Sequence, residues 1–170
     1  MKDLHKQILG CLPSLRRYSR ALTGSAEHAD DLVQESLTRA IDRLHLFKPG
    51  TNIRSWLFTI LHNQHINLVK REAVRPDRAA LEEKDAVNAS VPAGQEQHLA
   101  IQDIQKALEK LPKDQREVVL LIGLEELSYI EASEVLGIPV GTVMSRLSRG
   151  RAQLRKLMSE RANSGLRRVK

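Results

Sequence analysis

Apolar residues recur at the period of an α-helix through most of this chain, and this repeat restricts it to helical folds. The clearest run spans residues 29–44, where apolar side chains follow at steps of three, one, four, three, one and three. The run consists of Ala29, Leu32, Val33, Leu37, Ala40, Ile41 and Leu44. Aromatic residues make up only 3% of the chain, which disfavours a β-sandwich or barrel. The sequence therefore predicts an all-α fold.

Turn signals divide the chain into two helical domains. In the first domain we expect a helix over residues 4–22 with a break near Pro13, a second helix capped by Ser25, and a third beginning at Ile53. In the second we expect helices over 99–111, 114–123 and 128–136, and a last helix capped by Thr142 and ending near residue 158. The predicted domains are residues 1–73 and 98–170.

Residues 74–97 are predicted to form a flexible linker between these domains. This stretch contains Pro76, Pro92 and Gly94 and few large apolar side chains. A short helical piece is expected within it, at residues 78–85. The two domains are basic and the middle of the chain is slightly acidic.

Composition and charge exclude several classes of protein. No apolar stretch approaches the roughly 20 residues that a membrane-spanning helix needs, so we expect no stable membrane insertion. A single cysteine, Cys11, excludes an internal disulfide framework and indicates packing in a reducing cytoplasm. His62 and His65 lack further ligands nearby, so no metal site is predicted. No phosphate-binding loop or catalytic triad is found, which predicts a protein without a cofactor or enzymatic activity.

Residues 127–147 have the pattern of a helix-turn-helix. Ser133 is small where two helices cross, Gly137 permits a left-handed turn, and Val143 and Leu147 are placed to face the core. The second helix would enter a DNA major groove, since nine basic residues and one acidic residue lie between positions 144 and 170. Its candidate DNA-binding residues are Thr142, Met144, Ser145, Arg146, Ser148, Arg149 and Arg151. The simpler alternative is a helical hairpin with a basic end.

Three segments in order resemble a bacterial RNA polymerase sigma factor of the extracytoplasmic-function type, within the sigma-70 family. They are the acidic residues 29–35, the loop and tryptophan helix of residues 47–63, and residues 111–118 followed by the helix-turn-helix. The resemblance implies that domain 1–73 is sigma region 2 and that domain 98–170 is region 4. It implies binding to core RNA polymerase and to promoter DNA at the −10 and −35 elements, with region 4 reading the −35 element.

An acidic helix face is the candidate contact with core polymerase. Its residues are Glu27, Asp30, Asp31, Gln34 and Glu35. Taken alone, these are most simply solvated carboxylates at the start of a helix. The resemblance implies that they dock on the clamp helices of the polymerase, while the flap is a further contact of the factor.

The Pro-Gly-Thr-Asn loop and the helix after it are the candidates for reading and melting the −10 element. A preformed pocket there would take an unstacked base. The candidate residues are Lys48, Gly50, Thr51, Asn52, Arg54, Asn63, Lys70 and Arg71. The alternative is a plain connector in which Asn52 caps the helix. Trp56 belongs to the apolar stripe and is predicted to pack in the core rather than stack on a base.

The predicted function is a detachable specificity subunit of RNA polymerase, controlled by an anti-sigma factor. Two alternatives remain: a conventional DNA-binding regulator, and a sigma-like decoy that binds an anti-sigma protein without DNA. We expect the anti-sigma protein to insert between the two domains, covering the acidic face and part of region 4.

Overall fold

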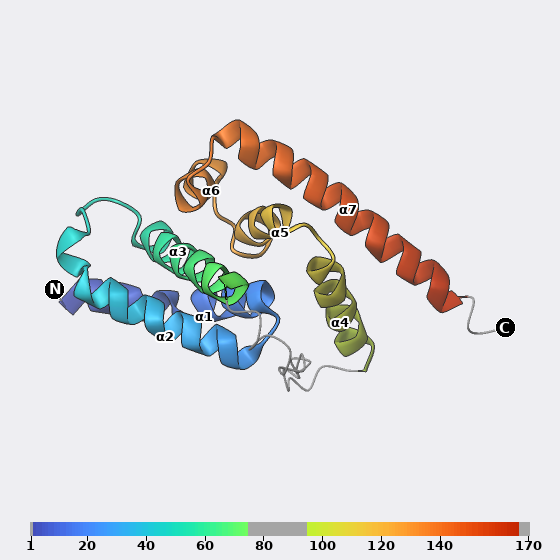
Figure 1. The fold of residues 1–170 in the computed structure, drawn as a ribbon, viewed down its shortest axis with the longest axis horizontal. Coiled ribbons are helices and arrows are strands. Elements are labelled where there is room, and N and C mark those ends of the chain that lie inside the picture. Colours follow the sequence, from blue (N-terminus) through green and yellow to red (C-terminus); the bar gives the residue numbers. More distant parts are fainter. Residues whose placement is uncertain (1, 75–94, 167–170) are drawn as a thin grey trace.

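The computed structural model describes residues 2–74 and 95–166, and this part of the chain is helical throughout, without strands. The first half contains α1 (Lys2–Thr23), α2 (Ala26–Asp42), the short η1 (Leu44–Leu46) and α3 (Ile53–Val74). The second half contains α4 (Gln95–Glu109), α5 (Lys113–Val119), η3 (Leu120–Leu124), α6 (Tyr129–Leu136) and α7 (Val140–Leu166) (Figure 1). The all-α fold in two helical domains is confirmed. The helical piece expected at residues 78–85 lies outside the described residues.

Local signals in the sequence set the helix boundaries of the first half. Ser25 caps α2 by accepting a hydrogen bond from the backbone N–H of His28 at 3.3 Å. Gly24 precedes it in the left-handed region, with φ +72°. Asn52 caps α3 as predicted, because its Oδ1 accepts from the backbone N–H of Arg54 at 2.9 Å.

The break expected near Pro13 is wrong, because α1 continues through this residue. Proline removes one N–H, which leaves the carbonyl of Leu9 without its helical partner. Leu9 is 63% exposed, so water reaches this side of the helix and can hydrate the carbonyl. The proline therefore lies on a face where its cost is small.

The helix-turn-helix forms as predicted, with one change at its second helix. Ser128 and Glu131 cap α6 reciprocally, and Gly137 ends it with φ +63°. The cap predicted at Thr142 is wrong: α7 begins at Val140, and the N–H of Thr142 donates to the carbonyl of Pro139 at 2.9 Å. Proline fixes the backbone just before the helix, so the helix starts three residues earlier than a cap at Thr142 would place it.

The helix predicted over residues 114–123 changes its winding near its end. It is α-helical to Val119 and then forms the π-turn η3, so the N–H of Glu125 donates to the carbonyl of Leu120 at 3.1 Å. Glu126 follows with φ +55°, a left-handed conformation that is uncommon for a residue with a side chain. This turn aims Glu125 inward, where its side chain is fully buried.

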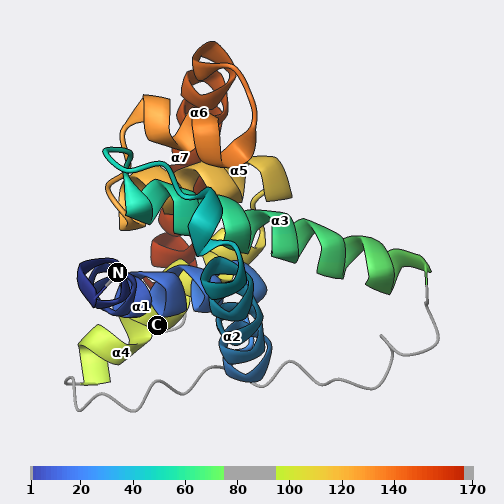
Figure 2. The same cartoon turned by 90° about the vertical axis from the view of Figure 1, so that its left-hand side faces the viewer.

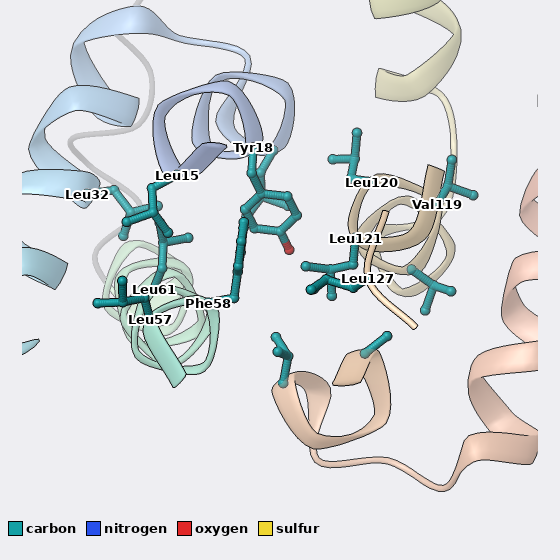
Figure 3. Close-up of a cluster of buried hydrophobic side chains, with 14 of the residues drawn as sticks. Leu15, Tyr18, Leu32, Leu57, Phe58, Leu61, Val119, Leu120, Leu121 and Leu127 are labelled. Carbon is teal, nitrogen blue, oxygen red and sulfur yellow. The ribbon is translucent and has the colours of Figure 1, made fainter. Parts of the chain in front are cut away.

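The two halves share one hydrophobic core. Figure 2 shows α3 between the α1–α2 pair and the group formed by α5, α6 and α7, and α3 contacts α6 directly. Tyr18 and Phe58 pack edge to face, with ring centroids 5.3 Å apart. Figure 3 shows the Phe58 ring beside the Tyr18 ring, whose hydroxyl end is directed toward Leu121, and Leu121 and Leu127 of the second half belong to the same buried cluster. The domains therefore pack against each other in this structure.

Gly150 allows α7 to pack closely against α5, and replacing it should destabilise the second half. A Cβ at this position would lie 2.7 Å from Cγ2 of Val119 and 3.4 Å from the carbonyl oxygen of Gln115. We expect Gly150→Ala to lower the free energy of unfolding in urea by about 1–3 kcal/mol. Gly141→Ala is the matched control, because a Cβ there meets nothing within 4 Å. Equal stability of the two variants would contradict this packing.

Candidate polymerase-binding and DNA-binding surfaces

The acidic face of α2 is exposed and accessible in this structure. Its opposite side is buried through Ala29, Leu32 and Val33, which orient the helix. All five candidate residues are exposed: Glu27, Asp30, Asp31, Gln34 and Glu35. The structure therefore brings them together on one surface, as the helical spacing predicts.

Two of these acids already have basic or amide partners. Oδ1 of Asp30 lies 3.9 Å from Nε of Arg16 and 3.8 Å from an Nη of Arg20. Oε1 of Glu35 accepts a hydrogen bond from Gln64 at 3.0 Å. Glu27 and Asp31 have no such partner in the described part of the chain. They are the acids most available to a basic partner.

The loop before α3 is shaped by its own hydrogen bonds. Gly50 adopts φ +87°, and the hydroxyl of Thr51 donates to the carbonyl of Lys48 at 2.7 Å. The ring of Trp56 is half-buried and packs on Phe47, with centroids 5.3 Å apart. This contact favours the packing role predicted for Trp56.

The candidate −10 residues do not share one face of α3. Seven are exposed: Lys48, Gly50, Thr51, Asn52, Asn63, Lys70 and Arg71. Arg54 lies nine residues before Asn63, which places it on the opposite side of the helix. Its guanidinium donates hydrogen bonds to the second half, while the side chain stays 32% exposed. The guanidinium also lies over the ring of Phe58, 5.6 Å from the centroid. Ser55 and His62 of the same helix are buried.

Two acids of the second half bind the loop and the start of α3. Glu125 accepts hydrogen bonds from Arg54 at its carboxylate (3.0 Å) and at its carbonyl (2.6 Å). Glu131 accepts one from Nδ2 of Asn52 at 2.5 Å. The pKa of Glu131 is lowered, first by the backbone N–H of Ser128 and further by Asn52, so the carboxylate is charged. Neither acid is among the site residues predicted from the sequence.

Only one of these acids carried a signal in the sequence. Glu131 stands three residues after Ser128, the spacing of a capping box, which identifies a structural role but not its contact with Asn52. Glu125 lies between Leu124 and Glu126 and follows a turn that no local pattern predicted. Arg17, whose Nε and Nη2 each donate to Glu125 at 2.8 Å, is separated from it by 108 positions.

The second helix of the helix-turn-helix presents most of its candidate residues to solvent. Val143 and Leu147 are buried beneath it, as predicted. The exposed residues are Met144, Ser145, Ser148, Arg149 and Arg151, whereas Thr142 is half-buried. Arg146 is also half-buried, and its Nε lies 3.3 Å from Asp114 of α5. In this structure Arg146 therefore connects α7 to α5.

A buried polar seam lies where α3 meets α5. His62 and His65 are only 3% and 7% exposed. Burial, with a smaller contribution from the charge of Lys113, lowers the pKa of each histidine to about 4. Burial also raises the pKa of Glu117 on α5. At neutral pH both histidines are uncharged.

The described residues, 2–74 and 95–166, contain no metal-binding cluster and no membrane-spanning helix. No group of three His, Cys, Asp or Glu side chains in this part of the chain is arranged to hold a metal ion. None of the helices described has the length and apolar character required to cross a bilayer. Cys11 packs against the hydrophobic core, as predicted.

Family models match each half separately. A model described as the Sigma2 domain of PhyR matches residues 8–62, and one for sigma-70 region 4 matches residues 101–154. The ECF RNA polymerase sigma factor EcfG of Rhodopseudomonas palustris is 41% identical over 159 residues, which are 92% of this chain and 85% of that protein.

Solved structures resemble both halves together. The sigma factor RpoE of Bartonella quintana, in complex with the anti-sigma factor NepR, superposes with a TM-score of 0.82 at 35% identity and covers 94% of this chain and 98% of that one. Because one superposition covers both halves, the halves are arranged alike in the two chains. The anti-anti-sigma factor PhyR of the same organism, solved with NepR, shares the fold at 20% identity and a TM-score of 0.58, covering 89% of this chain and 49% of that one.

These matches define a helix-turn-helix transcription factor of the sigma-70 class. More specifically, the chain belongs to the extracytoplasmic-function RNA polymerase sigma factors. It binds core RNA polymerase and directs initiation at specific promoters through the −10 and −35 elements.

Proposed function

We propose that residues 1–73 act as sigma region 2, residues 98–170 as region 4, and residues 74–97 as the linker between them. The two family matches, at residues 8–62 and 101–154, fall within these limits. The chain would act in the cytoplasm, where RNA polymerase works. It would supply promoter specificity, whereas the polymerase would form the phosphodiester bonds.

The exposed surfaces support a division of roles. The acidic face of α2 would bind the clamp helices of core polymerase, and region 4 would contact the flap. The loop around Thr51, with Lys48, Asn63, Lys70 and Arg71, would hold the −10 strand. The exposed residues of α7 would enter the major groove at the −35 element, where arginine recognises guanine or phosphate. Arg54 and Asn52 join the −10 surface only after they leave Glu125 and Glu131.

Control by an anti-sigma factor is supported by the similar sigma factor solved with NepR. We expected from the sequence an inhibitor inserted between the halves. Such an inhibitor would have to break the hydrogen bond between Arg54 and Glu125 and separate the shared core around Phe58. We therefore favour an inhibitor that covers α2 from outside. Cross-linking of an inhibitor complex would map its contacts.

A sigma-like decoy is the second candidate function. The observation in its favour is the match of residues 8–62 to the Sigma2 domain of PhyR, a protein described elsewhere as an anti-anti-sigma factor. Such a decoy would bind an anti-sigma protein without starting transcription. The exposed arginines of α7 favour the sigma factor instead.

Run-off transcription separates these candidates. Purified chain and core polymerase would be incubated with genomic DNA, and transcript 5′ ends would be mapped. A sigma factor yields discrete starts that depend on the chain. A decoy yields none, and a conventional regulator yields none without another sigma factor.

Replacing Thr51 and Asn52 by alanine should impair promoter melting more than polymerase binding. A base leaves the stack at a cost of a few kcal/mol, which contacts in the loop must offset. At a promoter mapped by run-off transcription, we expect permanganate-reactive thymines to fall by roughly tenfold, with core binding unchanged. Loss of the Asn52 cap should also lower stability by about 1 kcal/mol.

A pre-melted promoter is the control for this variant. Pre-melting should restore strand opening but not discrimination at the −10 bases. Full recovery of both on the pre-melted template would reject a base-reading role for the loop.

A further inference from the structure

The last helix, α7, continues well beyond the helix-turn-helix to which it contributes the second helix. The region 4 match ends at residue 154, whereas α7 runs from Val140 to Leu166 as one continuous helix (Figure 1). Residues 155–166 form the extension of α7. At 1.5 Å per residue, this extension adds about 18 Å to the helix. The candidate −35 residues all precede it, so its purpose is separate from base reading.

The start of the extension continues the face that α7 presents to DNA. Lys156 follows Arg149 by seven residues, about two helical turns, so the two side chains share one side of the helix. Arg155 follows Ser148 by the same interval, and all four side chains are exposed. The opposite side of the helix is apolar there, because Leu154 packs against the hydrophobic core. A helix docked in a groove through Ser148 and Arg149 therefore turns Arg155 and Lys156 toward the same DNA.

The two cations at the start of the extension are not neutralised by acids. Among the residues whose side chains the structure describes, no carboxylate forms an ion pair with Arg155 or Lys156. By contrast, Arg146 of the same helix is paired with Asp114 at 3.3 Å. Nε of Arg155 donates to the carbonyl of Arg151 at 3.3 Å, so this side chain lies back along the helix toward the helix-turn-helix. Its guanidinium is thus directed toward the end of α7 that would meet DNA.

The spacing of these residues along α7 fits the dimensions of the DNA major groove. Lys156 lies about 16 Å along the helix axis from Ser145 and about 10 Å from Arg149. The groove is about 12 Å wide, so a helix that meets base edges through Ser145 and Arg149 reaches the bordering phosphates one to two turns later. Basic side chains at such a border bind phosphate and position the protein without reading the sequence.

We propose that the extension of α7 carries a separate phosphate-binding site, in which Arg155 and Lys156 hold the DNA backbone at the border of the groove that residues 144–149 enter. The proposal rests on the proposed role of α7 at the −35 element. The ligand is the phosphate backbone of duplex DNA. The site adds affinity and fixes the register of the helix, and it adds nothing to base recognition. It lengthens the contact of region 4 with DNA beyond the −35 bases.

The test compares the full chain with the double variant Arg155→Gln, Lys156→Gln, because glutamine is neutral, long and favourable in helices. The probe is a fluorescent random-sequence DNA duplex of about 30 base pairs, titrated by anisotropy at several salt concentrations. Each phosphate contact contributes about 0.9 to the slope of log affinity against log salt, so the variant should have a slope shallower by about 1.8. Between about 50 and 200 mM salt, the unchanged chain should therefore lose about tenfold more affinity than the variant.

The matched control is Lys106→Gln, Lys110→Gln, which removes two exposed positive charges from α4 of the same half. Helix α4 contacts α7, and Leu108 of α4 belongs to the hydrophobic core against which Leu154 packs. The control charges therefore lie on the helix that covers the apolar side of α7. This variant should keep the slope of the unchanged chain, and circular dichroism would verify the helical content of both variants.

A second measurement separates phosphate binding from base reading. Once run-off transcription has mapped a promoter, the affinity of each chain for a duplex with its −35 element is compared with that for the random duplex. The ratio of the two affinities should be the same for the variant and the unchanged chain, because phosphate contacts affect all sequences alike. A ratio that falls in the variant would assign base reading to Arg155 and Lys156 and overturn the proposal.

An unaltered slope in the Arg155, Lys156 variant would overturn the phosphate-binding site, as would a full chain that fails to bind the random duplex at the lowest salt. An unaltered slope together with weaker capture of core polymerase would assign these cations to the polymerase instead. The salt titration does not use transcription. A shallower slope in a chain that starts no transcripts would support the phosphate-binding site while the proposed function fails by itself.

Discussion

Replacing Glu27 and Asp31 by arginine should weaken capture of core RNA polymerase by roughly tenfold or more. Both side chains are exposed on α2 and unpaired in the described part of the chain. Like charges brought together at an interface cost several kcal/mol, and about 1.4 kcal/mol corresponds to a factor of ten. Pull-down with purified core enzyme at fixed ionic strength measures this loss.

The control for this variant is Glu134→Arg, Glu160→Arg, which changes the net charge equally at exposed sites of the second half. It should retain core binding. Circular dichroism would verify that both variants keep their helical content. Undiminished capture of the α2 variant would show that the acidic face is merely solvated.

Lowering the pH from 6.5 to 5 should destabilise the chain by about 2–3 kcal/mol through His62 and His65. Both have a pKa of about 4 in the folded chain, below the ordinary value of 6.5. Between these values the unfolded chain binds more protons, so stability is present above pH 6.5 and is lost as the pH falls toward 4. Urea unfolding at a series of pH values measures how steeply the free energy of unfolding changes with pH.

Other charged groups near the buried histidines of α3 also affect the pH dependence of stability. Lys113 and Arg116 face the histidines from α5 and oppose their protonation. The raised pKa of Glu117 acts in the opposite direction, because its protonated form stabilises the fold at low pH. The double variant His62→Gln, His65→Gln should flatten the profile, whereas His45→Gln, at an exposed position, should not. A steep slope that persists without both buried histidines would disprove this origin.

Local chemistry predicted most of the fold. Helical periodicity located the apolar face of α2, and the caps predicted at Ser25 and Asn52 set helix starts, because each depends on residues close in sequence. The acidic face and the exposed face of α7 followed from the same spacing. Predictions failed where distant residues or solvent determine the local structure. At Pro13, for example, a break was predicted, but the helix continues because this face is exposed to water.

Contacts between the halves could not be predicted in this way. Arg54 appeared to belong with the other polar residues of α3, but its partner Glu125 lies 71 positions away. Glu125 itself points inward only because the backbone changes from an α-turn to a π-turn at Leu120. No single residue type signals that change, and a period of 3.6 residues does not describe it.

This π-turn makes the length of the segment as important as its composition. A turn closed from residue 125 to residue 120 contains one residue more than an α-helical turn. Removing one residue between 120 and 124 would restore regular winding and rotate the following carboxylate by about 100° around the helix axis. Arg17 and Arg54 would then lose this carboxylate as a partner, although all three charged residues would still be present in the sequence. Relatives with one residue fewer here would thus keep the three charged amino acids and lose the ion pairs between them.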